Sequence, residues 1–139
     1  LCDRRDSLSI FVFFLDNTFC LIAKGNSMTL PSIVPGQTKL GWIGTGVMGK
    51  SMCAQLMRAG FAMTIYNRSH AKTQELVGLG AKLAGTPAEV AQQSDVVFVM
   101  VGFPHDVRQV IMGEDGVLTT LRSQGIVVDM TTSSPQLAQ

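Results

Sequence analysis

The chain has 139 residues, which is enough for one domain of ordinary size and too few for two. Hydrophobic residues make up 46% and charged residues 15%, so the chain can bury a core and is not compositionally disordered. Its 11 basic and 10 acidic residues give a net charge of +1, which removes the general electrostatic argument for a nucleic-acid partner. We therefore expect one globular domain in which any anion site is local.

The three cysteines do not form a recognisable structural set. Cys2, Cys20 and Cys53 are odd in number and show no C-x-x-C spacing, which fits neither a disulfide framework nor a zinc site. Free thiols are typical of a reducing compartment. We therefore expect a cytoplasmic protein without a bound metal, with a mitochondrial location as the alternative.

An apolar run near the start of the chain is too short to cross a membrane. The run at residues 8–15 is followed at once by Asp16 and Asn17, whereas a membrane-spanning helix needs roughly 20 apolar residues. The sequence therefore predicts no membrane span and no membrane partner.

Residues 1–38 differ from the rest of the chain in another way. Arg4 and Arg5 precede the apolar run and give it the faint outline of a targeting segment. Met28 is the first methionine and a possible start of the protein. We expect residues 1–38 to be an extension that is disordered or serves targeting.

From Lys39 onward, short apolar segments alternate with helical patterns. Continuous apolar runs such as Val96–Val101 are typical of parallel strands that helices cover on both faces. We expect strands at residues 39–44, 62–66, 81–84, 96–101 and 125–130, and helices at 47–59, 70–79, from 87 onward and around 107–111. This alternation predicts right-handed crossovers and a doubly wound parallel α/β sheet over residues 39–139.

Three glycines stand where the first of these strands meets the first helix. Gly44, Gly46 and Gly49 form a G-x-G-x-x-G pattern, which is weak alone but strong between a strand and a helix. Gly44 permits a tight turn, Gly46 lets the backbone approach a pyrophosphate, and Gly49 lets the helix pack closely. The amide N–H groups at the start of the helix then face the anion. The alternative is that the glycines serve only tight packing.

The end of the second strand indicates which dinucleotide binds. An NAD site usually has Asp or Glu about 20 residues after the glycines, but here the sequence reads Asn67-Arg68-Ser69. Arg68 offers a planar set of donors suited to a 2′-phosphate. We therefore favour NADP(H), with NAD(H) as the alternative, in which case Arg68 is a solvated loop residue. The missing acid also argues against a methyltransferase that binds S-adenosylmethionine.

Hydroxyl groups follow the last predicted strand. Ligands of open α/β sheets lie outside the carboxyl ends of the strands, so Thr131 and Thr132 are candidate contacts for a nicotinamide amide or a substrate carboxylate. Ser134 stands before Pro135, an arrangement typical of a helix N-cap. We expect the two threonines to face a ligand and Ser134 to cap a helix.

Residues 39–139 resemble the cofactor-binding domain of the β-hydroxyacid dehydrogenase family, which includes 3-hydroxyisobutyrate dehydrogenase, glyoxylate and succinic semialdehyde reductases, and the related 6-phosphogluconate dehydrogenase. The resemblance rests on the segments GWIGTGVMG, YNRS, SDVVFVMV, GEDGVL and VDMTTSSP. It implies a Rossmann NAD(P)-binding fold. The cofactor contacts that it implies are Gly44, Thr45, Gly46, Val47, Met48, Gly49, Asn67, Arg68, Ser69, Val101, Gly102, Asp106 and Thr132. Thr131 is the implied substrate contact.

The chain departs from the family pattern in several ways. Thr45 replaces the usual Leu, and Gly102 stands where many members have Pro. The family's Ser-Gly-Gly substrate loop, catalytic Lys and helical domain have no counterpart before Gln139. We therefore assign no catalytic residue here and expect the Rossmann domain to be incomplete at its C-terminal end, with an exposed sheet edge where a sixth strand would pair.

Two functions follow from the resemblance. The first is hydride transfer between NADP(H) and a small β-hydroxy acid or semialdehyde of the 3-hydroxyisobutyrate, glyoxylate or succinic semialdehyde class, by a full-length protein that is homo-oligomeric. The second is a catalytically silent NADP-binding module, because the catalytic Lys and the helical domain are missing from these 139 residues.

Overall fold

Seven strands form one sheet. The computed structural model describes residues 9–15, 18–24 and 32–131. The strands lie in the order β2-β1-β7-β6-β3-β4-β5. Their bounds are β1 (Ser9–Leu15), β2 (Thr18–Lys24), β3 (Lys39–Ile43), β4 (Ala62–Tyr66), β5 (Lys82–Leu83), β6 (Val96–Val99) and β7 (Ile126–Asp129). The five strands from β3 to β7 are parallel to their neighbours, so the predicted doubly wound sheet is confirmed.

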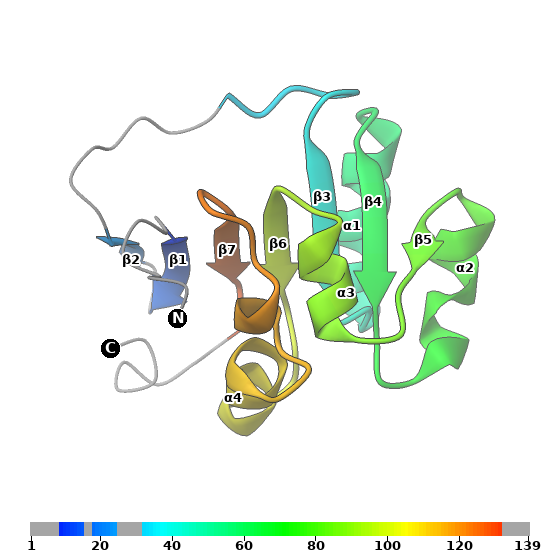
Figure 1. Cartoon of the computed structure of the whole chain (residues 1–139). Helices are drawn as coiled ribbons and strands as arrows, with labels where there is room; N and C mark the ends of the chain where they lie inside the picture. Colours follow the sequence, from blue (N-terminus) through cyan, green and yellow to red (C-terminus); the bar gives the residue numbers. More distant parts are fainter. Residues whose placement is uncertain (1–8, 16–17, 25–31, 132–139) are drawn as a thin grey trace.

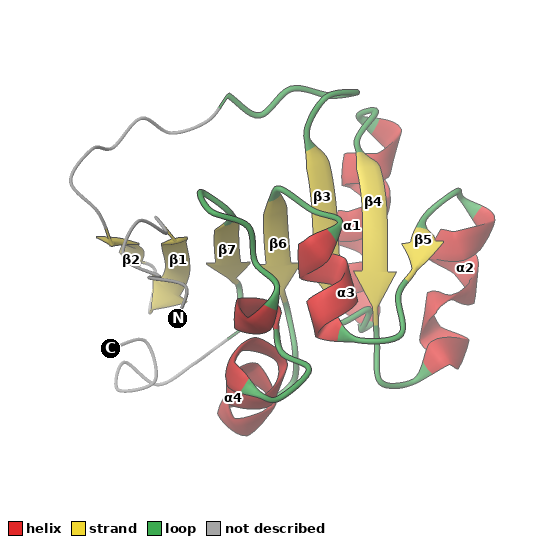
Figure 2. Ribbon diagram, viewed as in Figure 1, coloured by secondary structure: helices red, strands yellow, loops and turns green. Residues whose placement is uncertain are grey.

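Helices cover both faces of this sheet. Their bounds are α1 (Val47–Arg58), α2 (Gln74–Gly78), α3 (Pro87–Gln92) and α4 (Pro104–Met112), with short 3-10 helices η1 (His70–Thr73) and η2 (Val117–Thr119). In Figure 1, α1 lies behind β3 and β4 while α3 lies in front of them. Figure 2, which is coloured by secondary structure, shows the same arrangement of helices on the two faces of the sheet.

The helix ends agree with the sequence signals at most positions. The Thr86 hydroxyl accepts a hydrogen bond from the Glu89 amide at 3.2 Å and Pro87 opens α3, as expected. The helix expected over residues 70–79 is instead a 3-10 turn followed by the five-residue α2. Ser69 makes no side-chain cap there.

Two hydrophobic clusters form the core, one on each face of the sheet. Side chains of neighbouring strand residues point to opposite faces, so Val96 joins the cluster under α1 and Val97 joins the cluster under α3 and α4. Trp42 is fully buried in the first cluster and stacks on Phe98 with ring centroids 5.3 Å apart. These two layers hold the carboxyl ends of the parallel strands in fixed positions.

Two strands lie within the residues that were expected to form an extension. β1 pairs with β2 in antiparallel orientation and with β7 in parallel orientation. The register places Ile10–Phe13 opposite Ile126–Asp129. In this structure β1 therefore occupies the edge of β7 that was expected to be exposed.

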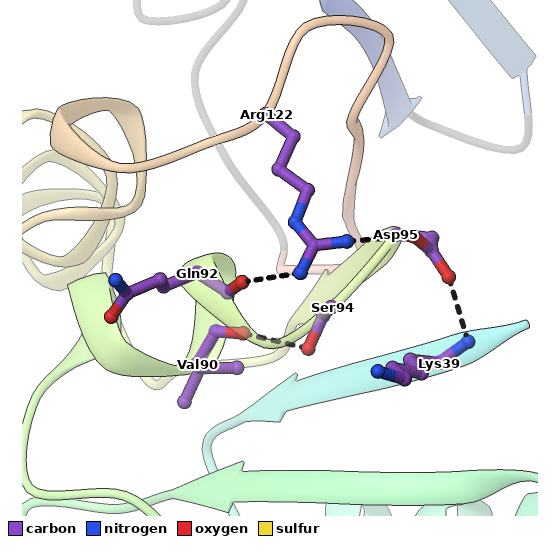
Figure 3. Close-up of polar contacts among 6 residues, drawn as sticks. All are labelled: Lys39, Val90, Gln92, Ser94, Asp95 and Arg122. Carbon is purple, nitrogen blue, oxygen red and sulfur yellow. Dashed lines mark hydrogen bonds and ion pairs between the residues drawn. The ribbon is translucent and has the colours of Figure 1, made fainter.

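A polar cluster joins the amino-terminal ends of β3 and β6 (Figure 3). The Asp95 carboxylate accepts a hydrogen bond from the Lys39 amide at 2.9 Å and lies 3.6 Å from the Arg122 guanidinium. Arg122 also donates to the Gln92 carbonyl oxygen at 3.0 Å. Asp95 thus links the starts of β3 and β6 to the loop before β7.

Candidate functional site

A cleft of about 1080 Å³ opens at the carboxyl ends of β3, β4, β6 and β7. This is where open α/β sheets bind their ligands. Its lining residues are Ile43, Gly44, Gly46, Met48, Gly49, Tyr66, Asn67, Arg68, Ser69, Lys72, Gly85, Thr86, Pro87, Met100, Val101, Gly102, Phe103, Asp106, Gln109, Val110, Gly113, Glu114, Asp115, Met130 and Thr131.

The turn after β3 is built on Gly44. Its φ of +97° lies in the left-handed region that glycine adopts without strain. The Gly44 amide donates to the Tyr66 carbonyl oxygen at 2.9 Å, and the Gly44 carbonyl oxygen accepts a hydrogen bond from the Trp42 indole nitrogen at 2.9 Å. Both peptide groups of this glycine are therefore held by neighbouring elements.

The other two glycines of the motif have opposite surroundings. A Cβ added at Gly49 would lie 2.3 Å from the Gly44 carbonyl oxygen and 3.2 Å from the Trp42 indole nitrogen. A Cβ added at Gly46 would meet nothing within 4 Å. Gly49 is thus required by packing within the chain, whereas Gly46 leaves open space at the start of α1. The first turn of α1 carries no acidic residue that would repel an anion.

The turn after β4 is tied to the glycine turn by Asn67. The Asn67 side-chain oxygen accepts from the Thr45 amide at 3.4 Å, and its side-chain nitrogen donates to the Ser69 carbonyl oxygen at 2.9 Å. The Arg68 side chain is 87% exposed, and its guanidinium lies 3.8 Å from the Asp106 carboxylate at the start of α4. A positive group therefore reaches across the cleft from β4 toward α4.

The ends of β6 and β7 are joined by Thr131. Its hydroxyl oxygen accepts a hydrogen bond from the Val101 amide at 3.0 Å, and its amide donates to the Asp129 carboxylate at 2.9 Å. Burial raises the pKa of the Asp129 carboxyl above its usual range, although hydrogen bonds from Thr131 act in the opposite direction. The second carboxylate oxygen of Asp129 has no hydrogen-bond partner among the described residues.

The structure brings most of the predicted site residues together. Of the predicted contacts, Gly44, Gly46, Met48, Gly49, Asn67, Arg68, Ser69, Val101, Gly102, Asp106 and Thr131 line the cleft. Thr45 and Val47 do not. The Thr45 side chain is buried and its hydroxyl has no partner among the described residues, while Val47 is 88% exposed. Thr132 and Ser134 lie outside the described residues.

Sequence reasoning missed one wall of the cleft. Gly85, Thr86 and Pro87 line it after β5, and Glu114 and Asp115 line it after α4. The rule that ligands lie beyond the carboxyl ends of strands would have found the first group, because β5 is a parallel strand as well. No local signal marked the second group, which has the composition of an ordinary turn.

The described part of the chain contains neither a cluster of metal-binding side chains nor a helix suited to span a membrane. Among its residues there is no group of three or more His, Cys, Asp or Glu side chains placed to hold a metal ion. None of its helices has the length and apolar character needed to cross a membrane.

Comparison with known proteins identifies the family of this chain. Residues 39–139 match the family model described as the NAD binding domain of 6-phosphogluconate dehydrogenase. A probable 3-hydroxyisobutyrate dehydrogenase-like protein 1, mitochondrial, from Arabidopsis thaliana is 50% identical over 126 residues, which cover 88% of this chain and 38% of that protein. The chain thus spans little more than a third of the length of this curated relative.

Solved structures show the same likeness. An imine reductase from Myxococcus stipitatus in complex with NADP+ is 33% identical with a TM-score of 0.66, covering 72% of this chain and 34% of that one. The 3-hydroxyisobutyrate dehydrogenase of Mycobacterium tuberculosis with L-serine is 25% identical with a TM-score of 0.67, covering 73% of this chain and 34% of that one. The chain therefore belongs to the β-hydroxyacid dehydrogenase family, and its residues 39–139 are the NAD(P)-binding domain of that family.

Proposed function

We propose that the cleft binds NADP(H) in preference to NAD(H), for hydride transfer to or from a small β-hydroxy acid or semialdehyde. The observation that carries the proposal is the open space above Gly46, where a Cβ would meet nothing within 4 Å at the start of a helix. Free N–H groups at such a start, without a side chain in the way, suit a pyrophosphate.

The preference for NADP(H) is supported by the turn after β4. That turn holds Asn67 and Arg68 and no carboxylate, and Lys72 lines the same part of the cleft. A dianionic 2′-phosphate would gain charge-assisted hydrogen bonds from the guanidinium. The imine reductase described above was solved with NADP+, and a variant of it was solved with NAD+, so the support for NADP(H) comes from the residues of this turn.

We assign the predicted contacts to parts of the cofactor as the family resemblance implies. In this proposal Gly44, Gly46, Met48 and Gly49 face the pyrophosphate, and Asn67, Arg68 and Ser69 face the adenosine ribose and its phosphate. Val101, Gly102, Asp106 and Thr132 lie along the cofactor toward the nicotinamide. Thr45 and Val47 contribute only backbone groups, since their side chains do not line the cleft.

Thr131 is the proposed contact for the substrate. Its hydroxyl oxygen already accepts a hydrogen bond from the Val101 amide, so the hydroxyl proton is the part that can serve an acceptor such as a substrate carboxylate. The Asp129 carboxylate next to it competes for the same proton. Thr131 therefore orients a substrate rather than reacting with it.

The proposed reaction requires a group that takes up or returns the hydroxyl proton of the substrate. A bound nicotinamide would supply hydride exchange with the hydroxyl-bearing carbon of the substrate, and this chemistry would require a base that takes up or returns the hydroxyl proton. Lys72 is the one lysine among the described residues that line the cleft, and it follows Arg68 by four residues in the turn after β4. The lysine that the family resemblance implies as the proton acceptor therefore has no counterpart among the described residues that line the cleft.

A mitochondrial location is our proposal for the compartment, in place of a cytoplasmic one. The Arabidopsis relative is named as mitochondrial, and its match covers more of this chain than residues 39–139 can supply. The match therefore extends into residues 1–38. We also propose that the whole protein is homo-oligomeric.

The test is a calorimetric titration of the chain with NADPH and NADH, followed by turnover assays with glyoxylate, succinic semialdehyde and 3-hydroxyisobutyrate. Binding of NADPH more tightly than NADH is the expected result. Binding without turnover by the whole protein would favour the alternative of a catalytically silent module. No binding of either nucleotide by a folded sample would refute the proposal.

A further inference from the structure

We infer that Trp42 is a positioning residue for cofactor binding, because its indole N–H fixes the orientation of the Gly44–Thr45 peptide group under the proposed phosphate site. The inference rests on the proposed function of the cleft. Trp42 is fully buried, lies on β3 and does not line the cleft. It therefore acts through the backbone and not by touching the cofactor.

The Gly44–Thr45 peptide needs an external constraint. Gly44 has no Cβ, and its φ of +97° lies where glycine moves at low cost. A peptide group flanked by such a residue rotates more easily than one between two side chains. The described structure supplies one strong partner for its carbonyl oxygen, the Trp42 indole nitrogen at 2.9 Å.

The direction of this carbonyl sets the direction of an amide. In a trans peptide group the C=O and the following N–H point in opposite directions, so a Gly44 carbonyl directed into the core turns the Thr45 N–H toward the cleft. The Asn67 side-chain oxygen accepts from that N–H at 3.4 Å, and Asn67 lines the cleft. The Trp42 bond thus favours the orientation in which the Thr45 N–H holds the side chain of Asn67, a residue that lines the cleft.

A rotated peptide would have the opposite effect. It would turn the carbonyl oxygen toward the cleft, where its partial negative charge repels an anion, and would leave the buried indole N–H without an acceptor. The first change opposes cofactor binding by electrostatics. The second makes the rotated state itself costly, because a buried donor is left unpaired, and so the Trp42 hydrogen bond disfavours the rotation.

Gly49 belongs to the same arrangement. A Cβ there would press on both the Gly44 carbonyl oxygen, at 2.3 Å, and the Trp42 indole nitrogen, at 3.2 Å. The absence of a side chain at Gly49 is what allows the indole and the carbonyl to meet. The packing glycine and the tryptophan therefore act together on one peptide group.

The alternative is that Trp42 only fills the core. It stacks on Phe98 and packs in the cluster under α1, and this role depends on the shape of the ring and not on the N–H. The two roles are separable because Trp42 is the one tryptophan of the chain. Production in a tryptophan-requiring host can replace this residue alone with benzothienylalanine, which has the same shape but carries sulfur in place of N–H.

The experiment compares three samples of the full chain: the natural protein, the benzothienylalanine protein, and a 7-azatryptophan protein that keeps the N–H. We expect the dissociation constant for NADPH to rise about three- to tenfold in the benzothienylalanine protein, as for one lost buried hydrogen bond, and to stay within about twofold in the 7-azatryptophan protein. Equal affinity in all three samples would overturn the inference, whatever the change in melting temperature.

A second measurement on the natural protein covers the case in which the benzothienylalanine protein does not fold. The chain gives one indole N–H resonance, which NADPH should shift in step with calorimetric saturation. A resonance that stays in place while NADPH binds would overturn the inference. Failure of the natural protein to bind NADPH or NADH is a different result, since it would refute the proposed function itself.

Discussion

A Cβ at residue 49 would lie 2.3 Å from the carbonyl oxygen of Gly44, closer than real Cβ contacts come. This relationship makes the first turn of α1 and the turn after β3 a single packed unit. It also separates the roles of the glycines, because Gly49 is needed by the fold while Gly46 faces open space.

Gly49→Ala should therefore destabilise the protein. The added methyl group must displace backbone, and overpacking of this kind costs about 1–3 kcal/mol. The free energy of unfolding, measured by chemical denaturation, is the appropriate readout. Gly78→Ala is the matched control, since a Cβ there meets nothing within 4 Å in a helix and should raise stability by about 0.5–1 kcal/mol. Equal effects of the two substitutions would contradict this explanation.

Arg68→Gln should weaken NADPH binding much more than NADH binding. Hydrogen bonds to charged groups contribute about 1.5–3 kcal/mol, and the exposure of this side chain places the effect near the lower end, at about tenfold in affinity. Titration of each variant with both nucleotides measures it. Arg108→Gln removes an equal charge from an exposed position of α4 outside the cleft and should change neither affinity. An equal loss for NADPH and NADH in Arg68→Gln would exclude a 2′-phosphate contact.

Much of this site could be predicted from local sequence. The glycine positions, the absence of an acid after β4 and the capping box at Thr86 each express a local backbone or charge requirement, so they can be recognised without knowing the fold. The cleft residues Gly44, Gly46 and Arg68 follow from them. The alternation of strands and helices likewise predicts a doubly wound parallel sheet, but it does not fix the order β7-β6-β3-β4-β5 in which the parallel strands lie.

The rest depends on contacts between distant segments. The Thr45 side chain is buried and the Val47 side chain is exposed. Both depend on how the turn after β3 packs against β4 and β6. The pairing of β1 with β7 joins residues more than a hundred positions apart, and no local pattern specifies it. The division of residues 70–78 into a 3-10 turn and a short helix likewise reflects tertiary packing, here of Leu76 against the sheet.

Asp129→Asn should change how stability depends on pH. Burial raises the pKa of Asp129 in the folded protein, so its contribution to stability is fully present below the unfolded pKa and is lost as pH rises through the folded pKa. Asparagine carries no charge and keeps an acceptor for the Thr131 amide. Relative to the natural protein, the variant should therefore become more stable as pH rises from about 4 to 7.

Urea unfolding at several pH values measures this difference in the free energy of unfolding. Asp115→Asn, at an exposed position, serves as the control for loss of one negative charge. A constant difference between Asp129→Asn and the natural protein over this pH range would show that Asp129 is not subject to a burial penalty.

Cys53 should be unreactive in the folded protein. It is fully buried, and burial raises the pKa of its thiol from 9.0 to about 12, so its thiolate is suppressed even in mild alkali. Its contribution to stability is present below pH 9.0 and is lost as pH rises toward 12. In a variant with Cys2→Ser and Cys20→Ser, labelling by a thiol reagent should occur only at the rate of unfolding. Rapid labelling of the native protein would contradict the buried position.

The most direct test of a dinucleotide site at the glycine turn is calorimetric titration of the natural chain and of Gly46→Ala with NADPH. Glycine and alanine differ by about 1 kcal/mol or less as helix N-caps, and the new methyl group meets nothing in the chain, so the variant should remain folded. We predict that the natural chain binds NADPH and that Gly46→Ala binds at least about tenfold more weakly, because the methyl group occupies the space of the pyrophosphate. Equal affinities in two folded samples would contradict the account.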